Sequence, residues 1–120
     1  SIDSDYAILI DIENNKVLAD KNGTQRISPA SLTKLMTLVV AVENIDDFED
    51  TFTMTGDIIV PLVDKEASGA GFSEGEQVKI TDMLYGAVLP SGADATVGLA
   101  QYISGSEEEF VKLMNCIAKN

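Results

Sequence analysis

The chain has 120 residues, of which 45% are hydrophobic and 23% are charged, and its formal net charge is −12. This balance is typical of one globular domain with a modest core and excludes a disordered segment. The acidic excess would repel nucleic acid and anionic membrane surfaces, so neither is an expected partner. The sequence contains no histidine, which excludes a Ser-His-Asp or Cys-His catalytic arrangement and most zinc sites.

The single cysteine, Cys116, cannot form an internal disulfide. It lies in a helical pattern, where a buried thiol is the ordinary interpretation. No apolar run has the length of a membrane span, and no basic-then-apolar signal peptide opens the chain. We therefore expect either a cytoplasmic protein or one whose signal was removed before residue 1.

The chain begins with the pattern of a β-hairpin. Strand-forming residues fill 6–12, Asn14 and Asn15 supply a turn, and residues 16–20 return as a second strand. The sequence Lys-Asn-Gly at 21–23 then ends the second strand.

An apolar helix is expected next, over residues 29–44. Ser28 is predicted to be its N-cap, with Pro29 at the first helical position, where the missing N–H has no cost. The apolar residues of one stripe are Leu35, Leu38, Val39 and Val42, extended by Met36 and Val40. So much apolar surface predicts a helix that is buried on most sides.

The middle of the chain carries weaker signals. The acidic run at 46–50 lacks the spacing and the glycine of a calcium loop, so a solvated loop is expected there. Residues 51–55 alternate like a strand. The glycine-rich segment 67–76 is expected to be irregular, and it lacks the spacing of a phosphate-binding loop.

Short helices are expected in the last third of the chain, over residues 82–89, 93–103 and 107–119. Thr81 and Ser91 are predicted to cap the first two of these. Gly105 closes the second, and Ser106 with Glu109 makes a capping box for the last.

Ser31 and Lys34 stand three residues apart near the start of the first helix and share a face. Free backbone N–H groups and the helix dipole in this turn favour negative charge and suit an oxyanion. A lysine on a mostly buried helix loses hydration, which makes the neutral amine available as a base. The pair is therefore suited to a serine nucleophile activated by lysine. The spacing alone favours a simpler interpretation, an exposed serine beside a lysine whose stem covers a core helix.

The residues around this pair favour the catalytic interpretation over the simpler one, because residues 28–37 read SPASLTKLMT. This string resembles the active-site signature of the serine-type D-alanyl-D-alanine carboxypeptidases, the low-molecular-mass penicillin-binding proteins. The resemblance extends in order over essentially the whole chain, through the hairpin, residues 71–100 and the final helix. It implies an α/β (α+β) fold of the β-lactamase/transpeptidase type, with an N-terminal hairpin and a helical region but without the C-terminal sheet strands.

At the family's second motif, Ser-x-Asn, the chain reads Ser-Gly-Ala-Asp over residues 91–94. By resemblance, Ser91 would shuttle a proton near Lys34, and Gly92 and Ala93 would belong to the substrate-binding segment. Ala93 departs from the pattern, because it has no side-chain amide to contact Lys34 or the substrate. The N-cap assignment of Ser91 is compatible with the proton-shuttle role.

The family's third motif, Lys-Thr/Ser-Gly, is missing. The sequence at 21–23 precedes the nucleophile and belongs to the hairpin. The resemblance therefore implies that residues 1–120 are the N-terminal portion of a single catalytic domain, inactive by itself. In the family fold the hairpin pairs with C-terminal strands. We therefore expect its unpaired edge, residues 5–13, to form a homodimer or to aggregate.

The function implied by the resemblance is removal of the terminal D-alanine from the peptidoglycan pentapeptide, through an acyl-enzyme on Ser31. β-Lactams would be inhibitors, no cofactor or metal would be needed, and the protein would act outside the cytoplasmic membrane, with its signal and anchor not in this chain. Alternatives within the superfamily are a β-lactamase and a D,D-endopeptidase. A non-catalytic scaffold or interaction domain is a further alternative, because of Ala93 and the missing third motif.

Overall fold

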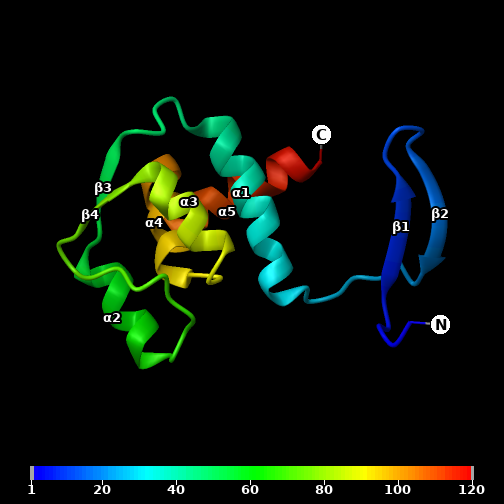
Figure 1. The fold of residues 1–120 in the computed structure, drawn as a ribbon, viewed down its shortest axis with the longest axis horizontal. Coiled ribbons are helices and arrows are strands. Elements are labelled where there is room, and N and C mark those ends of the chain that lie inside the picture. The colour runs from blue at the N-terminus through cyan, green and yellow to red at the C-terminus, as the bar shows by residue number, and fades with distance from the viewer. Residues whose placement is uncertain (1, 120) are drawn as a thin grey trace.

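The fold, taken from a computed structural model that describes residues 2–119, combines a detached hairpin with a helical body (Figure 1). In chain order the elements are β1 (Ala7–Asp11), β2 (Lys16–Lys21), a 3-10 turn (Ala30–Leu32), α1 (Thr33–Asn44), β3 (Thr51–Thr53), α2 (Gly56–Asp64), β4 (Gln77–Lys79), α3 (Ile80–Val88), α4 (Ala93–Ser104) and α5 (Glu107–Ala118). The strands form two separate antiparallel pairs, β1 with β2 and β3 with β4. Within the described residues, no helix is long and apolar enough to cross a membrane.

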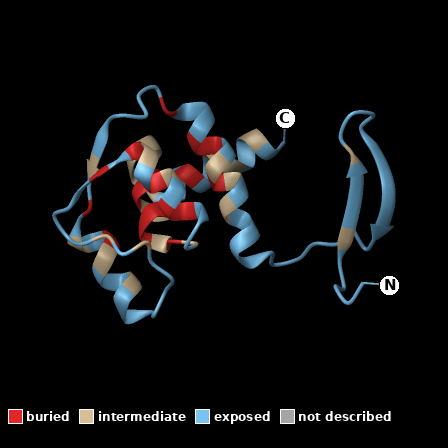
Figure 2. Cartoon of the chain, in the orientation of Figure 1, coloured by how far each residue is buried: buried red, intermediate tan, exposed pale blue. Residues whose placement is uncertain are grey.

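The predicted hairpin is confirmed, with Ala7 opposite Lys21 and Asp11 opposite Lys16. The Asp11 carboxylate accepts hydrogen bonds from the backbone of the turn, and Asn15 adopts a positive φ of 49°, as asparagine tolerates in turns. The hairpin stands apart from the helices, and most of its residues are exposed on both faces (Figure 2).

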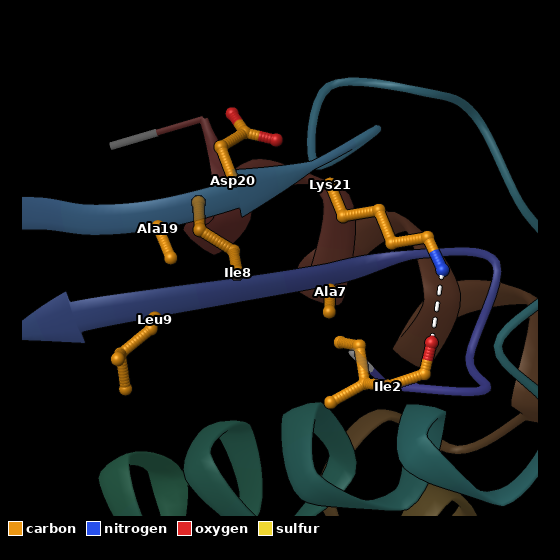
Figure 3. Close-up of a pocket in the computed structure, with 7 residues that line it drawn as sticks. All are labelled: Ile2, Ala7, Ile8, Leu9, Ala19, Asp20 and Lys21. Carbon is orange, nitrogen blue, oxygen red and sulfur yellow. Dashed lines mark hydrogen bonds between the residues drawn. The ribbon is translucent and has the colours of Figure 1, made fainter.

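An apolar cavity of about 670 Å³ lies against the hairpin, and Figure 3 shows the side chains that line it. Apolar residues from both strands contribute, and the ammonium group of Lys21 donates a hydrogen bond to the carbonyl of Ile2 at 3.1 Å. The hairpin therefore presents open apolar surface as well as unpaired strand edges.

The helical body is built around α1, α3 and α4, which contact one another. Its principal core cluster includes Ala41, Ile45, Met54, Ile58, Met83 and Leu99. A second cluster, made by Val40, Ala100 and Phe110, attaches α5 to the other side of α1 and α4. This packing fixes the start of α1 against the turn between α3 and α4.

The prediction that α1 is buried on most sides is wrong for the described residues. Val40 is fully buried, but Leu35, Val39 and Val42 are about half exposed, at 56%, 48% and 48%. Periodicity identifies the apolar residues of a helix but not the element that covers each face. Here α3, α4 and α5 cover one side of α1, and the opposite side remains open.

The first two predicted helix starts are wrong. Ser28 does not cap α1, because a 3-10 turn precedes the helix and Ala30 has a φ of 49°. Thr81 lies inside α3, whose N-cap is Lys79, and its hydroxyl donates instead to the carbonyl of Phe48 at 2.8 Å. Hydroxyl side chains satisfy several kinds of backbone group, so their presence near a helix start does not fix the first residue.

The three remaining predicted helix ends give a mixed result. Ser91 is not the N-cap of α4, a position taken by Gly92, whereas Gly105 closes that helix with a φ of 78° as predicted. The Ser106 hydroxyl accepts from the backbone N–H of Glu109 at 3.2 Å, which confirms the predicted cap of α5. Cys116, expected to be buried, is exposed on this last helix.

Residues 51–80 contain more structure than the sequence indicated. The strand expected at 51–55 is β3, and it pairs with β4 through Phe52 opposite Val78. The helix α2 was not predicted, and it contains Pro61, a residue that normally argues against a helix interior. The prediction that residues 67–76 are irregular is confirmed, and this segment contacts the first turn of α4.

Candidate active site

Ser31 and Lys34 lie on successive turns at the N-terminal end of the first helical segment. Ser31 is the middle residue of the 3-10 turn, and Lys34 lies in the first turn of α1. The preceding residue, Ala30, has a left-handed φ of 49°, which is uncommon for a residue with a side chain. Ser31 is exposed and Lys34 is partly buried.

Ser91 is brought to this pair by the turn between α3 and α4. The Lys34 ammonium donates to the Ser91 hydroxyl at 2.9 Å and to the Ser91 carbonyl at 2.6 Å. The Ser91 hydroxyl in turn donates to the Ser31 hydroxyl at 3.1 Å. These contacts form a continuous path from Lys34 through Ser91 to Ser31, although Lys34 and Ser91 are 57 positions apart in sequence.

The path opens onto a cavity of about 330 Å³. Its lining residues are Pro29, Ser31, Leu32, Lys34, Leu35, Ala87, Val88 and Ser91. Two serine hydroxyls and the Lys34 ammonium therefore share one mostly apolar recess, an arrangement suited to acyl transfer.

Gly92 and Ala93 do not line this cavity. Gly92 is buried, and the backbone N–H of Ala93 donates to the carbonyl of Ser68 at 2.7 Å. The methyl group of Ala93 cannot form a hydrogen bond, and the second partner of the Lys34 ammonium is the Ser91 carbonyl. Their assignment to substrate binding stays a prediction.

Sequence reasoning missed what Asp94 does. Its side chain is 5% exposed and accepts backbone N–H groups of the 67–76 segment. A signal was available, because an irregular glycine-rich segment leaves many N–H donors that require an acceptor. Within residues 2–119, Cys, Asp and Glu side chains form no group of three or more that could hold a metal ion.

Comparison with known proteins gives a consistent result. The family model described as D-alanyl-D-alanine carboxypeptidase matches residues 1–120. The chain is 40% identical to the D-alanyl-D-alanine carboxypeptidase DacF of Bacillus subtilis, over 94% of this chain and 29% of that protein. It is 38% identical to DacC of Escherichia coli, over 99% of this chain and 31% of that protein. The chain thus spans about a third of the length of these curated relatives.

The solved structures give the same result for the fold. A mutant of a Streptomyces DD-transpeptidase matches with a TM-score of 0.94 and 27% identity, over 100% of this chain and 49% of that one. The expected transpeptidase-like fold, with hairpin and helical region, is confirmed.

Proposed function

Because the chain belongs to the D-alanyl-D-alanine carboxypeptidase family, we propose that Ser31, Lys34 and Ser91 are the acylating centre of a serine carboxypeptidase. The observation that carries this proposal is the hydrogen-bonded path from Lys34 through Ser91 to Ser31. The substrate is the peptidoglycan stem peptide, from which the terminal D-alanine is removed. This substrate places the reaction on the cell-wall side of the membrane.

In the proposed reaction, the Ser31 hydroxyl attacks the carbonyl between the two D-alanine residues. Neutral Lys34 receives the serine proton, and the Ser91 hydroxyl transfers it across the gap between them. The tetrahedral intermediate collapses when the protonated centre returns a proton to the departing D-alanine amine. Water then hydrolyses the ester on Ser31. A β-lactam would acylate Ser31 by the same attack.

The oxyanion that forms in this step needs two donors. The backbone N–H of Ser31 would supply one of them. The other, together with the group that holds the substrate carboxylate, is assigned to the family's third motif, which these 120 residues do not contain. We therefore propose that residues 1–120 are one part of a catalytic domain. By themselves they release no D-alanine from the unstrained stem peptide, whereas the strained ring of a β-lactam still acylates Ser31.

The test is the intact mass of the chain after incubation with benzylpenicillin. We expect a mass increase equal to one penicilloyl group, lost in Ser31→Ala and retained in Ser28→Ala, an exposed serine outside the cavity. A gain that survives Ser31→Ala would refute Ser31 as the nucleophile. No gain would favour the non-catalytic scaffold unless a chain extended through the third motif is acylated. Rapid turnover of benzylpenicillin would indicate a β-lactamase.

A further inference from the structure

Asp94 is a buried carboxylate that the reaction above does not use. Its Oδ1 accepts the backbone N–H of Ala70 at 2.7 Å and that of Ala95 at 2.8 Å. Its Oδ2 accepts the N–H groups of Gly71 and Phe72, each at 3.2 Å. One side chain thus joins the irregular segment to the first turn of α4.

The same segment encloses the turn that carries Ser91. The Gly92 N–H donates to the carbonyl of Gly86 in α3 at 2.9 Å, and the Ala93 N–H donates to the carbonyl of Ser68 at 2.7 Å. A Cβ atom at Gly92 would lie 2.6 Å from the Gly86 oxygen, 2.8 Å from the Ala70 nitrogen and 2.8 Å from Asp94 Oδ1. The turn is therefore held between α3, the irregular segment and the Asp94 carboxylate, with no room for a side chain.

This enclosure has a direct consequence for Ser91. The residue has a φ of 58°, a left-handed conformation that serine rarely adopts without support from its surroundings. In that conformation its carbonyl and its hydroxyl both accept from the Lys34 ammonium. A turn that relaxed to an ordinary conformation would redirect the carbonyl away from Lys34.

We propose that Asp94 is a positioning residue that holds Ser91 in the left-handed conformation required to connect Lys34 to Ser31. Its catalytic consequence rests on the proposed function, whereas its effect on the turn does not. The carboxylate is required because all four of its partners are donors. An asparagine in its place would turn an NH₂ group toward one pair of them.

The experiment compares wild type, Asp94→Asn and the matched control Asp82→Asn, an exposed acid in the first turn of α3. Amide hydrogen exchange measures the stability of the turn that carries Ser91, and it does not depend on acylation of Ser31. In Asp94→Asn we expect the Gly92 and Ala93 amides to lose protection while core amides such as that of Leu99 keep theirs. Acylation of Ser31 by benzylpenicillin is measured across pH in parallel. We expect at least a tenfold lower rate and an altered pH profile in Asp94→Asn, with Asp82→Asn like wild type.

The two readouts separate the two claims. Unchanged protection of Gly92 and Ala93 in folded Asp94→Asn would overturn the positioning role, whatever the acylation result. Lost protection with wild-type acylation would overturn its catalytic consequence. An unreactive wild type would count against the proposed function only. If Asp94→Asn does not fold, amide hydrogen exchange of the wild type at low denaturant concentration tests the proposal instead. The amides of residues 70–72 and 92–93 should then open as one unit. Independent opening of these two groups of amides would contradict the proposal.

Discussion

The Ser91 hydroxyl is the only described link between Lys34 and Ser31, so its removal tests the proposed proton path most directly. In Ser91→Ala the hydroxyl contacts at 2.9 Å and 3.1 Å are lost, but the 2.6 Å contact from Lys34 to the backbone carbonyl remains. A positioned proton-transfer group contributes about 100- to 10,000-fold to a rate, or ~3–5 kcal/mol of activation free energy. We expect the acylation of Ser31 to slow by a factor in this range.

Stability should respond far less than reactivity. The lost hydroxyl contacts are worth about 1–2 kcal/mol together. Ser91→Gly removes the same hydroxyl but also relieves the left-handed backbone at φ 58°. The free energy of unfolding of the glycine variant should therefore be about 1 kcal/mol higher than that of the alanine variant. The rate of Ser31 acylation should be equally low in both variants.

The assay is a time course of intact mass with benzylpenicillin, beside urea unfolding of each variant. Ser73→Ala, an exposed serine in the irregular segment, serves as the control and should match wild type in both measurements. A Ser91→Ala protein that acylates at the wild-type rate would refute the path through this hydroxyl. An alanine variant as stable as the glycine variant would refute the backbone argument.

Three further predictions concern the fold. Leu99→Ala, at a fully buried position, should lower the free energy of unfolding by about 2–5 kcal/mol, whereas half-exposed Val111→Ala should change it by no more than about 1 kcal/mol, as checked by urea titration. The Tyr102 hydroxyl donates a hydrogen bond to the Asp50 carboxylate at 2.8 Å and lowers the pKa of that carboxyl from its ordinary value of 3.8. This contact therefore stabilises the fold at pH values above 3.8, and the stabilisation is lost as the pH falls through the lowered pKa. On acidification, Tyr102→Phe should therefore lose less of its free energy of unfolding than wild type. An equal loss of unfolding free energy at low pH in the two proteins would contradict this prediction. The exposed hairpin should pair with a second copy, so light scattering at high concentration should show a dimer that Leu9→Lys converts to monomer, and a wild-type monomer would exclude it.

The sequence was sufficient for the hairpin, for most helices and for the placement of Ser31 and Lys34 on the same side of the first helical segment, where both line one cavity. Local signals carried these predictions, namely turn residues, apolar periodicity and a three-residue spacing on one helical face. The family resemblance added Ser91, which no local pattern connects to Lys34. Long-range contacts of this kind depend on how α1 and α3 pack against each other, and this packing cannot be predicted from the sequence of either segment alone.

Other features depended on tertiary context. The irregular segment 67–76 has no periodic pattern. Its unpaired N–H donors indicated that an acceptor is needed, but only the three-dimensional arrangement identifies Asp94 as that acceptor. The helix containing Pro61 forms because packing of residues such as Ile58 in the core outweighs the local cost of proline. The exposed side of α1 could not be foreseen, because periodicity does not reveal which neighbours a helix has.

The extended connection between the hairpin and the helical body has a practical consequence for dissecting this molecule. Residues 22–29 are exposed and contain Arg26, so trypsin has an accessible cleavage point between the two parts. A cut after Arg26 would leave every helix, together with Ser31, Lys34 and Ser91, on one continuous polypeptide. Limited digestion therefore offers a way to ask whether the reactive centre assembles without the hairpin.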